Sequence, residues 1–184
     1  MRRLIINADD FGLTNGVNRA ISGLNCASVL TSTTLMARAG ATDAAIELAH
    51  ASPSLSVGCH VVLVDGDPVL PARAIPSLVD SKTGSFRITL GAFLRQLLTG
   101  RIRPEEIEAE ARAQIESLQS RGVRITHIDT HKHTHMFPSV LRPVLRAARA
   151  CGIRAVRNPF EPAWAVHASA GARWARVAEV TLLR

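Results

Sequence analysis

Aromatic residues, cysteines and long hydrophobic runs are all scarce in this sequence. Aromatic side chains make up only 4% of the 184 residues, so few are available to stack on nucleic-acid bases. Three cysteines, Cys26, Cys59 and Cys151, are odd in number and lack Cys-x-x-Cys spacing, which argues against a disulfide framework. No apolar stretch reaches the length of about 20 residues that a membrane-spanning helix needs. The apolar start also ends at Asn7, too early for a signal peptide, so we expect a cytoplasmic protein.

Basic residues outnumber acidic ones by 22 to 15, which gives a net charge of +7. The arginines are dispersed along the chain and form no dense block. We therefore expect no specific nucleic-acid binding, although a loose association with an acidic membrane surface fits this charge. The length and a hydrophobic content of 47% predict one domain over residues 1–184 with its own core.

Apolar runs alternate with segments of helical periodicity along most of the chain. Strands are predicted at 3–8, 31–36, 55–63, 123–128 and 153–156, and helices at 17–24, 42–51, 88–100, 104–121 and 138–151. This alternation predicts an α/β fold with parallel strands, whose carboxyl ends lie at one rim. The irregular segment 71–87 is long enough to be a substrate-binding loop.

Histidine and aspartate occupy every second position in one stretch near the predicted fourth strand. On an extended strand this spacing places the side chains on one face, and they are His127, Asp129, His131, His133 and His135. Imidazole and carboxylate together are a common ligand set for divalent metals, so the stretch predicts a metal or catalytic site. The alternative is a set of surface or core histidines, or a weak metal-binding tract.

Other polar side chains end neighbouring strands and extend this site. Asp9 and Asp10 follow the first predicted strand, and both can serve one site only if the strand ends there. Taken alone, they would be read as a helix cap. His60 lies at the mouth of the third strand and Arg157 follows the fifth. One rim is therefore expected to hold Asp9, Asp10, His60, Asp129, His131 and Arg157, and three ligands with an open position are typical of a catalytic metal site.

These motifs, in this order, resemble those of the YdjC-like carbohydrate deacetylases. The matching pieces cover nearly the whole chain and are Asn7–Gly12, Thr31–Thr34, Gly58–His60 and Thr126–Pro138. Within that family, Gly58–Gly66 and Arg157–Pro162 resemble the branch associated with hopanoid biosynthesis.

The resemblance implies a distorted (β/α) barrel that removes acetyl from an N-acetylated sugar or glycolipid with one divalent metal ion, zinc or magnesium. In the hopanoid branch the substrate would be an N-acetylglucosaminyl hopanoid lipid. The implied metal ligands are Asp10, His60 and His131, and the implied catalytic base is Asp9. His127 and Asp129 would support these residues, His133 and His135 would shape the pocket, and Arg157 would support them or contact substrate.

Two other functions fit the same residues. One is a different metal-dependent hydrolase, such as a phosphoesterase. It would use the excess of basic residues and Arg157 to bind an anionic substrate, and it would hold more ligands around two metals. A metal-binding module without turnover is the second alternative. Phosphate release or the absence of any turnover would distinguish them from a deacetylase.

The end of the chain leads to a separate expectation. A closed eight-stranded barrel takes about 250 residues, whereas only five or six strands can be placed here. We therefore expect the barrel to be incomplete at its C-terminus, and we expect the family's general acid to lie in the absent part, because nothing around His167 matches it. An open sheet edge favours a homo-oligomer, or coverage of the edge by the apolar segment Val177–Leu183.

Overall fold

The computed structural model describes residues 4–160, and its centre is a parallel β-sheet. Four strands lie side by side in chain order, each parallel to the next: β1 (Asn7–Phe11), β2 (Ser32–Leu35), β3 (Ser56–Val61) and β4 (Ile128–Thr130). A single parallel bridge joins Val156 to Ile128 and continues the sheet beyond β4. Strand order without reversal is that of a (β/α) barrel wall rather than of a doubly wound sheet.

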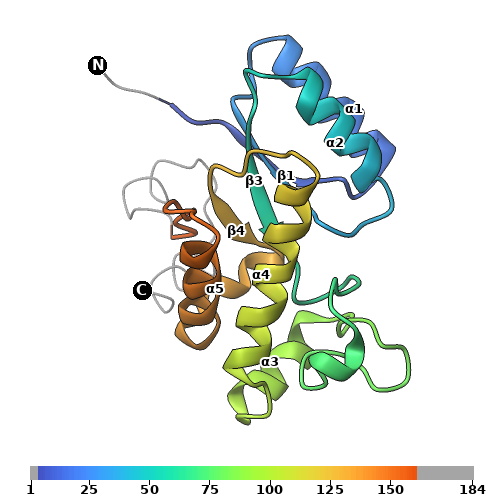
Figure 1. Cartoon of the computed structure of the whole chain (residues 1–184), viewed down its shortest axis with the longest axis vertical. Coiled ribbons are helices and arrows are strands. Elements are labelled where there is room, and N and C mark those ends of the chain that lie inside the picture. Colours follow the sequence, from blue (N-terminus) through green and yellow to red (C-terminus); the bar gives the residue numbers. More distant parts are fainter. Residues whose placement is uncertain (1–3, 161–184) are drawn as a thin grey trace, which may run out of the picture.

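Helices connect the strands and bury their apolar faces against the sheet. Figure 1 shows α1 beside α2 and α4 beside α5. Their bounds are α1 (Asn15–Cys26), α2 (Thr42–Ala51), α3 (Leu90–Leu98), α4 (Pro104–Ser120) and α5 (Pro138–Ala150), with short 3₁₀ turns η1 (Ala72–Ala74) and η2 (His131–Met136). In α4 the fully buried side chains of Ile107, Ala111, Ile115 and Leu118 recur at helical spacing, so one face of α4 belongs to the core. None of the helices within residues 4–160 is long and apolar enough to cross a membrane.

Helix α4 also carries buried polar side chains that hold the long segment following β3. Glu110 is fully buried, and its carboxylate accepts the backbone N–H groups of Val69 and Leu70 at 2.8 and 3.0 Å. Gln114 pairs with both backbone groups of Val62 at 2.7 and 2.8 Å. The chain that leads into the predicted substrate-binding segment 71–87 is therefore anchored to the core. Burial raises the pKa of Glu110, and the charge-assisted hydrogen bonds offset part of that cost.

Most predicted elements are present, but three strands differ from expectation. The first was predicted at residues 3–8, whereas β1 begins at Asn7 and continues through the two acids, and Leu4 and Ile5 are 78% and 76% exposed. β4 has only three residues, because the chain turns after Thr130. The predicted strand 153–156 is reduced to the bridge at Val156. His167, Val177–Leu183 and the last two residues of the Arg157–Pro162 motif lie outside the described residues.

Candidate metal centre

A bulge in β1 brings both acids to one side of the sheet. The pairing of β1 with β2 shifts register between Ala8 and Phe11, and Asp10 has φ of 64°. A left-handed backbone at a non-glycine residue is uncommon and rotates the side chain relative to a regular strand. Asp9 and Asp10 therefore face the same site although the strand does not end between them. The expectation that the strand stops at the acids was wrong, and the bulge achieves the same result.

Three donor atoms from three strand ends meet beside this bulge. Asp10 Oδ1 is 3.2 Å from His60 Nε2 and 3.1 Å from His131 Nδ1, and the two ring nitrogens are 3.3 Å apart. Asp10 and His131 are partly exposed, whereas His60 is buried with 2% exposure. The group thus has one closed side and one side open to solvent. Its members are three of the residues expected at the rim.

The spacing of these atoms matches the needs of a divalent metal. With ligand bonds of about 2 Å, tetrahedral geometry places donor atoms about 3.3 Å apart. The three donor–donor distances of 3.1, 3.2 and 3.3 Å agree with that value. Two imidazole nitrogens and one carboxylate oxygen are also a donor set that zinc accepts. The residues present therefore fit a catalytic metal with an open position.

Asp129 fixes the orientation of the His60 ring. His60 Nδ1 lies 2.6 Å from Asp129 Oδ1, so the Nδ1 proton is donated to the buried carboxylate and Nε2 faces the other ligands. Burial disfavours protonation of His60, but hydrogen bonds with Asp10 and Asp129 outweigh it and raise the pKa of His60 to about 9. The hydrogen bond with His60 is the main reason that the pKa of Asp10 is lowered. The metal-free site therefore holds a proton that a metal would displace.

Asp9 is held by donors on two sides. Arg157 Nη1 donates to both carboxylate oxygens of Asp9, at 2.6 and 2.8 Å, and lies 3.4 Å from Asp129 Oδ2. Asn7 Nδ2 donates to Asp9 Oδ1 at 2.7 Å. The guanidinium of Arg157 is thus already paired with an acid of the site. That pairing makes Arg157 a support for Asp9 in this geometry.

The histidine run does not stay on one strand face. Lys132 and His133 have φ of 54° and 51°, so the chain turns sharply within η2. The prediction that five alternating residues share one face is wrong for His133 and His135. His135 is buried, its Nδ1 lies 2.6 Å from Thr130 Oγ1, and its Nε2 donates to the backbone carbonyl of Arg157 at 3.1 Å. His135 therefore ties the turn to the segment that carries Arg157.

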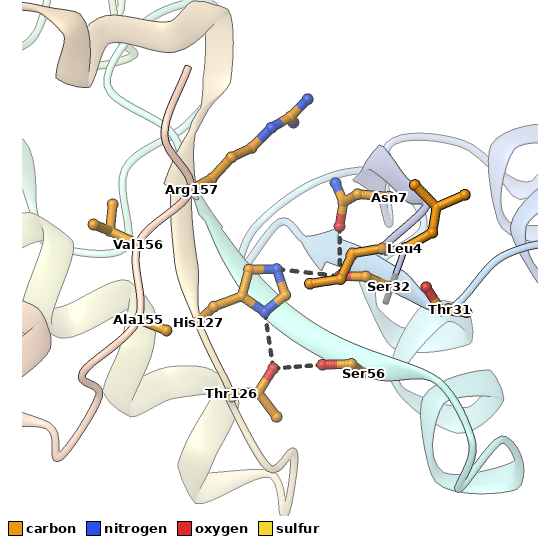
Figure 2. Close-up of a pocket in the computed structure, with 11 residues that line it drawn as sticks. Leu4, Asn7, Thr31, Ser32, Ser56, Thr126, His127, Ala155, Val156 and Arg157 are labelled. Atoms are coloured by element: carbon orange, nitrogen blue, oxygen red, sulfur yellow. Dashed lines mark hydrogen bonds between the residues drawn. The ribbon is translucent and has the colours of Figure 1, made fainter. Parts of the chain in front are cut away.

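A cavity of about 780 Å³ adjoins the site on the face of the sheet that carries His127. Figure 2 shows His127 in its wall, between Ser32 and Thr126. The distances are 3.4 Å from His127 Nε2 to Ser32 Oγ and 2.8 Å from His127 Nδ1 to Thr126 Oγ1. Leu4, Ile5 and Val156 supply apolar lining, and Asn7 and Arg157 connect the cavity to Asp9. Neither His133 nor His135 lines this cavity.

Three polar residues of the site were missed by sequence reasoning. Thr34 Oγ1 lies 3.2 Å from both His60 Nδ1 and Asp129 Oδ2, and Ser32 Oγ donates to Asn7 Oδ1 at 2.7 Å. Ser32 and Thr34 contact His127 and His60, and Asn7 contacts Asp9 and Ser32. The sequence offered two signals for these residues. Asn7 lies two positions before Asp9, and Ser32 and Thr34 alternate on one face of a strand. Neither signal identifies cross-strand partners without knowledge of register.

A second group of possible metal ligands shares His60 with the first. Ligand atoms of Asp9, His60 and Asp129 also lie within 4.8 Å of one another. However, His60 Nδ1 and Asp129 Oδ1 are bonded to each other, and Asp9 is bonded to Arg157. Among the described residues, the group formed by Asp10, His60 and His131 is therefore the better candidate for metal binding.

Known proteins similar to this chain agree with the fold and with the motifs. The family model for YdjC-like proteins matches residues 3–184. Carbohydrate deacetylases of Brevibacillus brevis and Halalkalibacterium halodurans are 41% and 37% identical over 86% and 80% of this chain. The chain spans only about 60% of the length of these two relatives.

A solved structure also matches the fold. The crystal structure of a candidate cellobiose-phosphate cleavage protein from Enterococcus faecalis V583 superposes with a TM-score of 0.72 at 31% identity. The match covers 98% of this chain and 64% of that protein. The α/β fold with its parallel sheet is thus consistent with a distorted (β/α) barrel. Because the family match extends over nearly the whole sequence, the chain belongs to the YdjC-like protein family.

Proposed function

We propose that this chain carries the metal centre of a carbohydrate N-deacetylase, which hydrolyses the acetamide of an N-acetylated sugar to acetate and a free amine. The observation that supports it most directly is the triangle of donor atoms from Asp10, His60 and His131, with Asp9 beside it. The similar curated proteins are named carbohydrate deacetylases. Amide hydrolysis needs a polarised carbonyl, an activated water and a base, and this site offers residues for each need.

Asp10, His60 and His131 would hold one divalent ion, and zinc suits two imidazoles and one carboxylate better than magnesium does. When bound, such an ion acts as a Lewis acid toward the amide carbonyl and lowers the pKa of a coordinated water. Asp129 keeps His60 in the tautomer that presents Nε2 to the ion. The open side of the triangle, where Asp10 and His131 are partly exposed, leaves access for the sugar.

Asp9 would be the proton acceptor. Water adds to the amide carbon and its proton passes to the Asp9 carboxylate. The C–N bond then breaks as the nitrogen takes up a proton, which the protonated Asp9 supplies in the absence of a separate general acid, and the free amine leaves. Arg157 and Asn7 hold the Asp9 carboxylate in one orientation, so little reorganisation precedes proton transfer. The salt bridge also means that Arg157 supports Asp9 instead of binding an anionic substrate, which disfavours the phosphoesterase alternative.

Finer assignments belong to the same proposal. The resemblance of Gly58–Gly66 to the hopanoid-associated branch supports an N-acetylglucosaminyl lipid as substrate, and the net charge of +7 suits an acidic membrane surface. A cytoplasmic location and self-association through the open sheet edge are proposed with it.

An acetate-release assay tests the proposal. Purified protein is stripped with a chelator, reloaded with zinc or magnesium, and incubated with N-acetylglucosamine conjugates, while phosphate release from sugar phosphates is measured in parallel. We expect acetate only after reloading and no phosphate. Phosphate without acetate would support a phosphoesterase, and zinc binding without either product would support a metal-binding module.

A further inference from the structure

One buried hydroxyl lies between the base and the metal ligands without a role in the mechanism above. Thr34 Oγ1 is 3.2 Å from His60 Nδ1, 3.2 Å from Asp129 Oδ2 and 3.4 Å from Asp9 Oδ1. Thr34 is fully buried on β2, and its three partners come from β3, β4 and β1. A single hydroxyl therefore contacts functional residues of the three other strands.

Counting hydrogens restricts what this hydroxyl can do. The Nδ1 hydrogen of His60 is taken by Asp129 Oδ1 at 2.6 Å, so His60 needs no acceptor from Thr34. The only hydrogen of Thr34 must then go to a carboxylate oxygen, either Asp129 Oδ2 or Asp9 Oδ1. Asp129 is fully buried, and within residues 4–160 its Oδ2 has one partner besides Thr34, the Arg157 contact at 3.4 Å. Removing the hydroxyl would leave that buried oxygen poorly satisfied.

We propose that Thr34 is a positioning residue for both functions of the site, an inference that rests on the proposed deacetylase function. Its hydroxyl holds Asp129, and through Asp129 it fixes the ring of His60 that presents Nε2 to the metal site. The same hydrogen has Asp9 Oδ1 as its second acceptor. Thr34 thereby links the base to the residue that orients a metal ligand.

The neighbouring residue offers a matched control. Thr33 is also fully buried on β2, but its side chain points away from the site and donates to the backbone carbonyl of Ala8 at 2.8 Å. Thr33→Val and Thr34→Val each remove one buried hydroxyl from the same strand with the same change of shape. A purely structural role would make the two substitutions equivalent. Thr34→Ser keeps the hydroxyl and should restore the function of Thr34.

Zinc affinity of the metal-stripped protein is the first measurement, by calorimetry on wild type, Thr34→Val, Thr34→Ser and Thr33→Val. Loss of an outer partner of a metal ligand weakens binding by about 10–100-fold, and we expect Thr34→Val to lie near the lower end of that range. Thr34→Ser and Thr33→Val should stay within about twofold of wild type. Equal zinc affinity in Thr34→Val and wild type would overturn the proposal, as would an equal loss in Thr33→Val.

Acetate release at saturating zinc is the second measurement. We expect kcat to fall in Thr34→Val, with KM changed less, because Asp9 loses a partner while the open side of the site is intact. Should wild type bind zinc and release no acetate, the proposed function fails while the zinc affinities still decide the role of Thr34. Failure of wild type to bind zinc would overturn both. If the valine variant does not fold, Thr34→Ala and Thr33→Ala replace the pair, with the same criteria.

Discussion

Gly58 allows the ring of His127 to lie flat against β3, and replacing it tests that packing without any metal. A Cβ built on Gly58 would lie 2.6, 2.7 and 2.8 Å from Nε2, Cε1 and Cδ2 of His127. These contacts are with three atoms of one ring, so the whole His127 side chain must move to relieve them. Gly58 is not among the glycines with a positive φ, so only the side-chain clash opposes an alanine there. Gly58→Ala must therefore displace His127 from Ser32 and Thr126.

The magnitude follows from two opposing terms. Overpacking by one methyl group costs about 1–3 kcal/mol, whereas alanine in a strand gains about 0.5–1 kcal/mol over glycine. We expect Gly58→Ala to lower the free energy of unfolding by about 1–2 kcal/mol. In a His127→Ala background the clash is absent, and Gly58→Ala should then be neutral or stabilising. The coupling between the two substitutions is therefore about 2 kcal/mol.

Urea unfolding followed by circular dichroism on wild type, both single variants and the double variant measures this coupling. Gly23→Ala is the control, because nothing lies within 4 Å of a Cβ at Gly23 in α1. That substitution should stabilise the protein by up to about 1 kcal/mol through helix propensity alone. Additive effects of Gly58→Ala and His127→Ala would refute the packing described here.

Four further predictions concern the acids and His60. Asp9→Asn should leave zinc affinity nearly unchanged and lower turnover about a hundredfold, whereas Asp10→Asn should no longer bind zinc. Calorimetry measures both zinc affinities, and an equal loss in the two variants would contradict the separate roles of the two acids. The pKa of His60 without metal is raised to about 9, so zinc must displace a proton from this ring. Zinc affinity should therefore rise about tenfold per pH unit up to pH 9. A zinc affinity that does not change with pH would contradict His60 as a ligand. The same rise of the His60 pKa from 6.5 also stabilises the metal-free fold. This stabilisation is complete below pH 6.5, and up to about 3 kcal/mol of the free energy of unfolding should be lost as the pH rises through 9. Urea titrations at several pH values would detect the loss. Glu110→Ala should lower the free energy of unfolding by about 2 kcal/mol or more, because it leaves two backbone N–H groups unpaired. Glu116 is exposed, so Glu116→Ala should lower it by less than about 1 kcal/mol. Equal costs would contradict the anchoring role of Glu110.

The assembly of the site could be predicted from the sequence because it depends on one general rule. Parallel strands joined by helices end at one rim, so residues at successive strand ends meet whatever the details of packing. The triangle formed by Asp10, His60 and His131 is an instance of this rule. Helix bounds followed equally well from periodicity, and α2 begins and ends at the predicted residues 42 and 51.

Features that depend on local backbone or on register could not be predicted. The turn in η2 uses left-handed conformations at Lys132 and His133. Histidine is enriched in that conformation among non-glycine residues, but the enrichment is too small to mark a turn inside a run of histidines. The β1 bulge likewise depends on a left-handed backbone conformation, at Asp10. Contacts of Thr34 require the register of three strand pairs. Glu110 lies on the core face of α4, three residues after Ile107, but its residue type is rarely buried and gave no sign of the backbone N–H groups that it holds.

Crystallographic location of zinc tests the central claim most directly. Crystals of the protein soaked in zinc should show an anomalous peak about 2.0–2.2 Å from Asp10 Oδ1, His60 Nε2 and His131 Nδ1, and the His60 Nδ1 contact with Asp129 should persist. A zinc peak elsewhere, with these three side chains more than about 3 Å from it, would contradict the proposed metal centre.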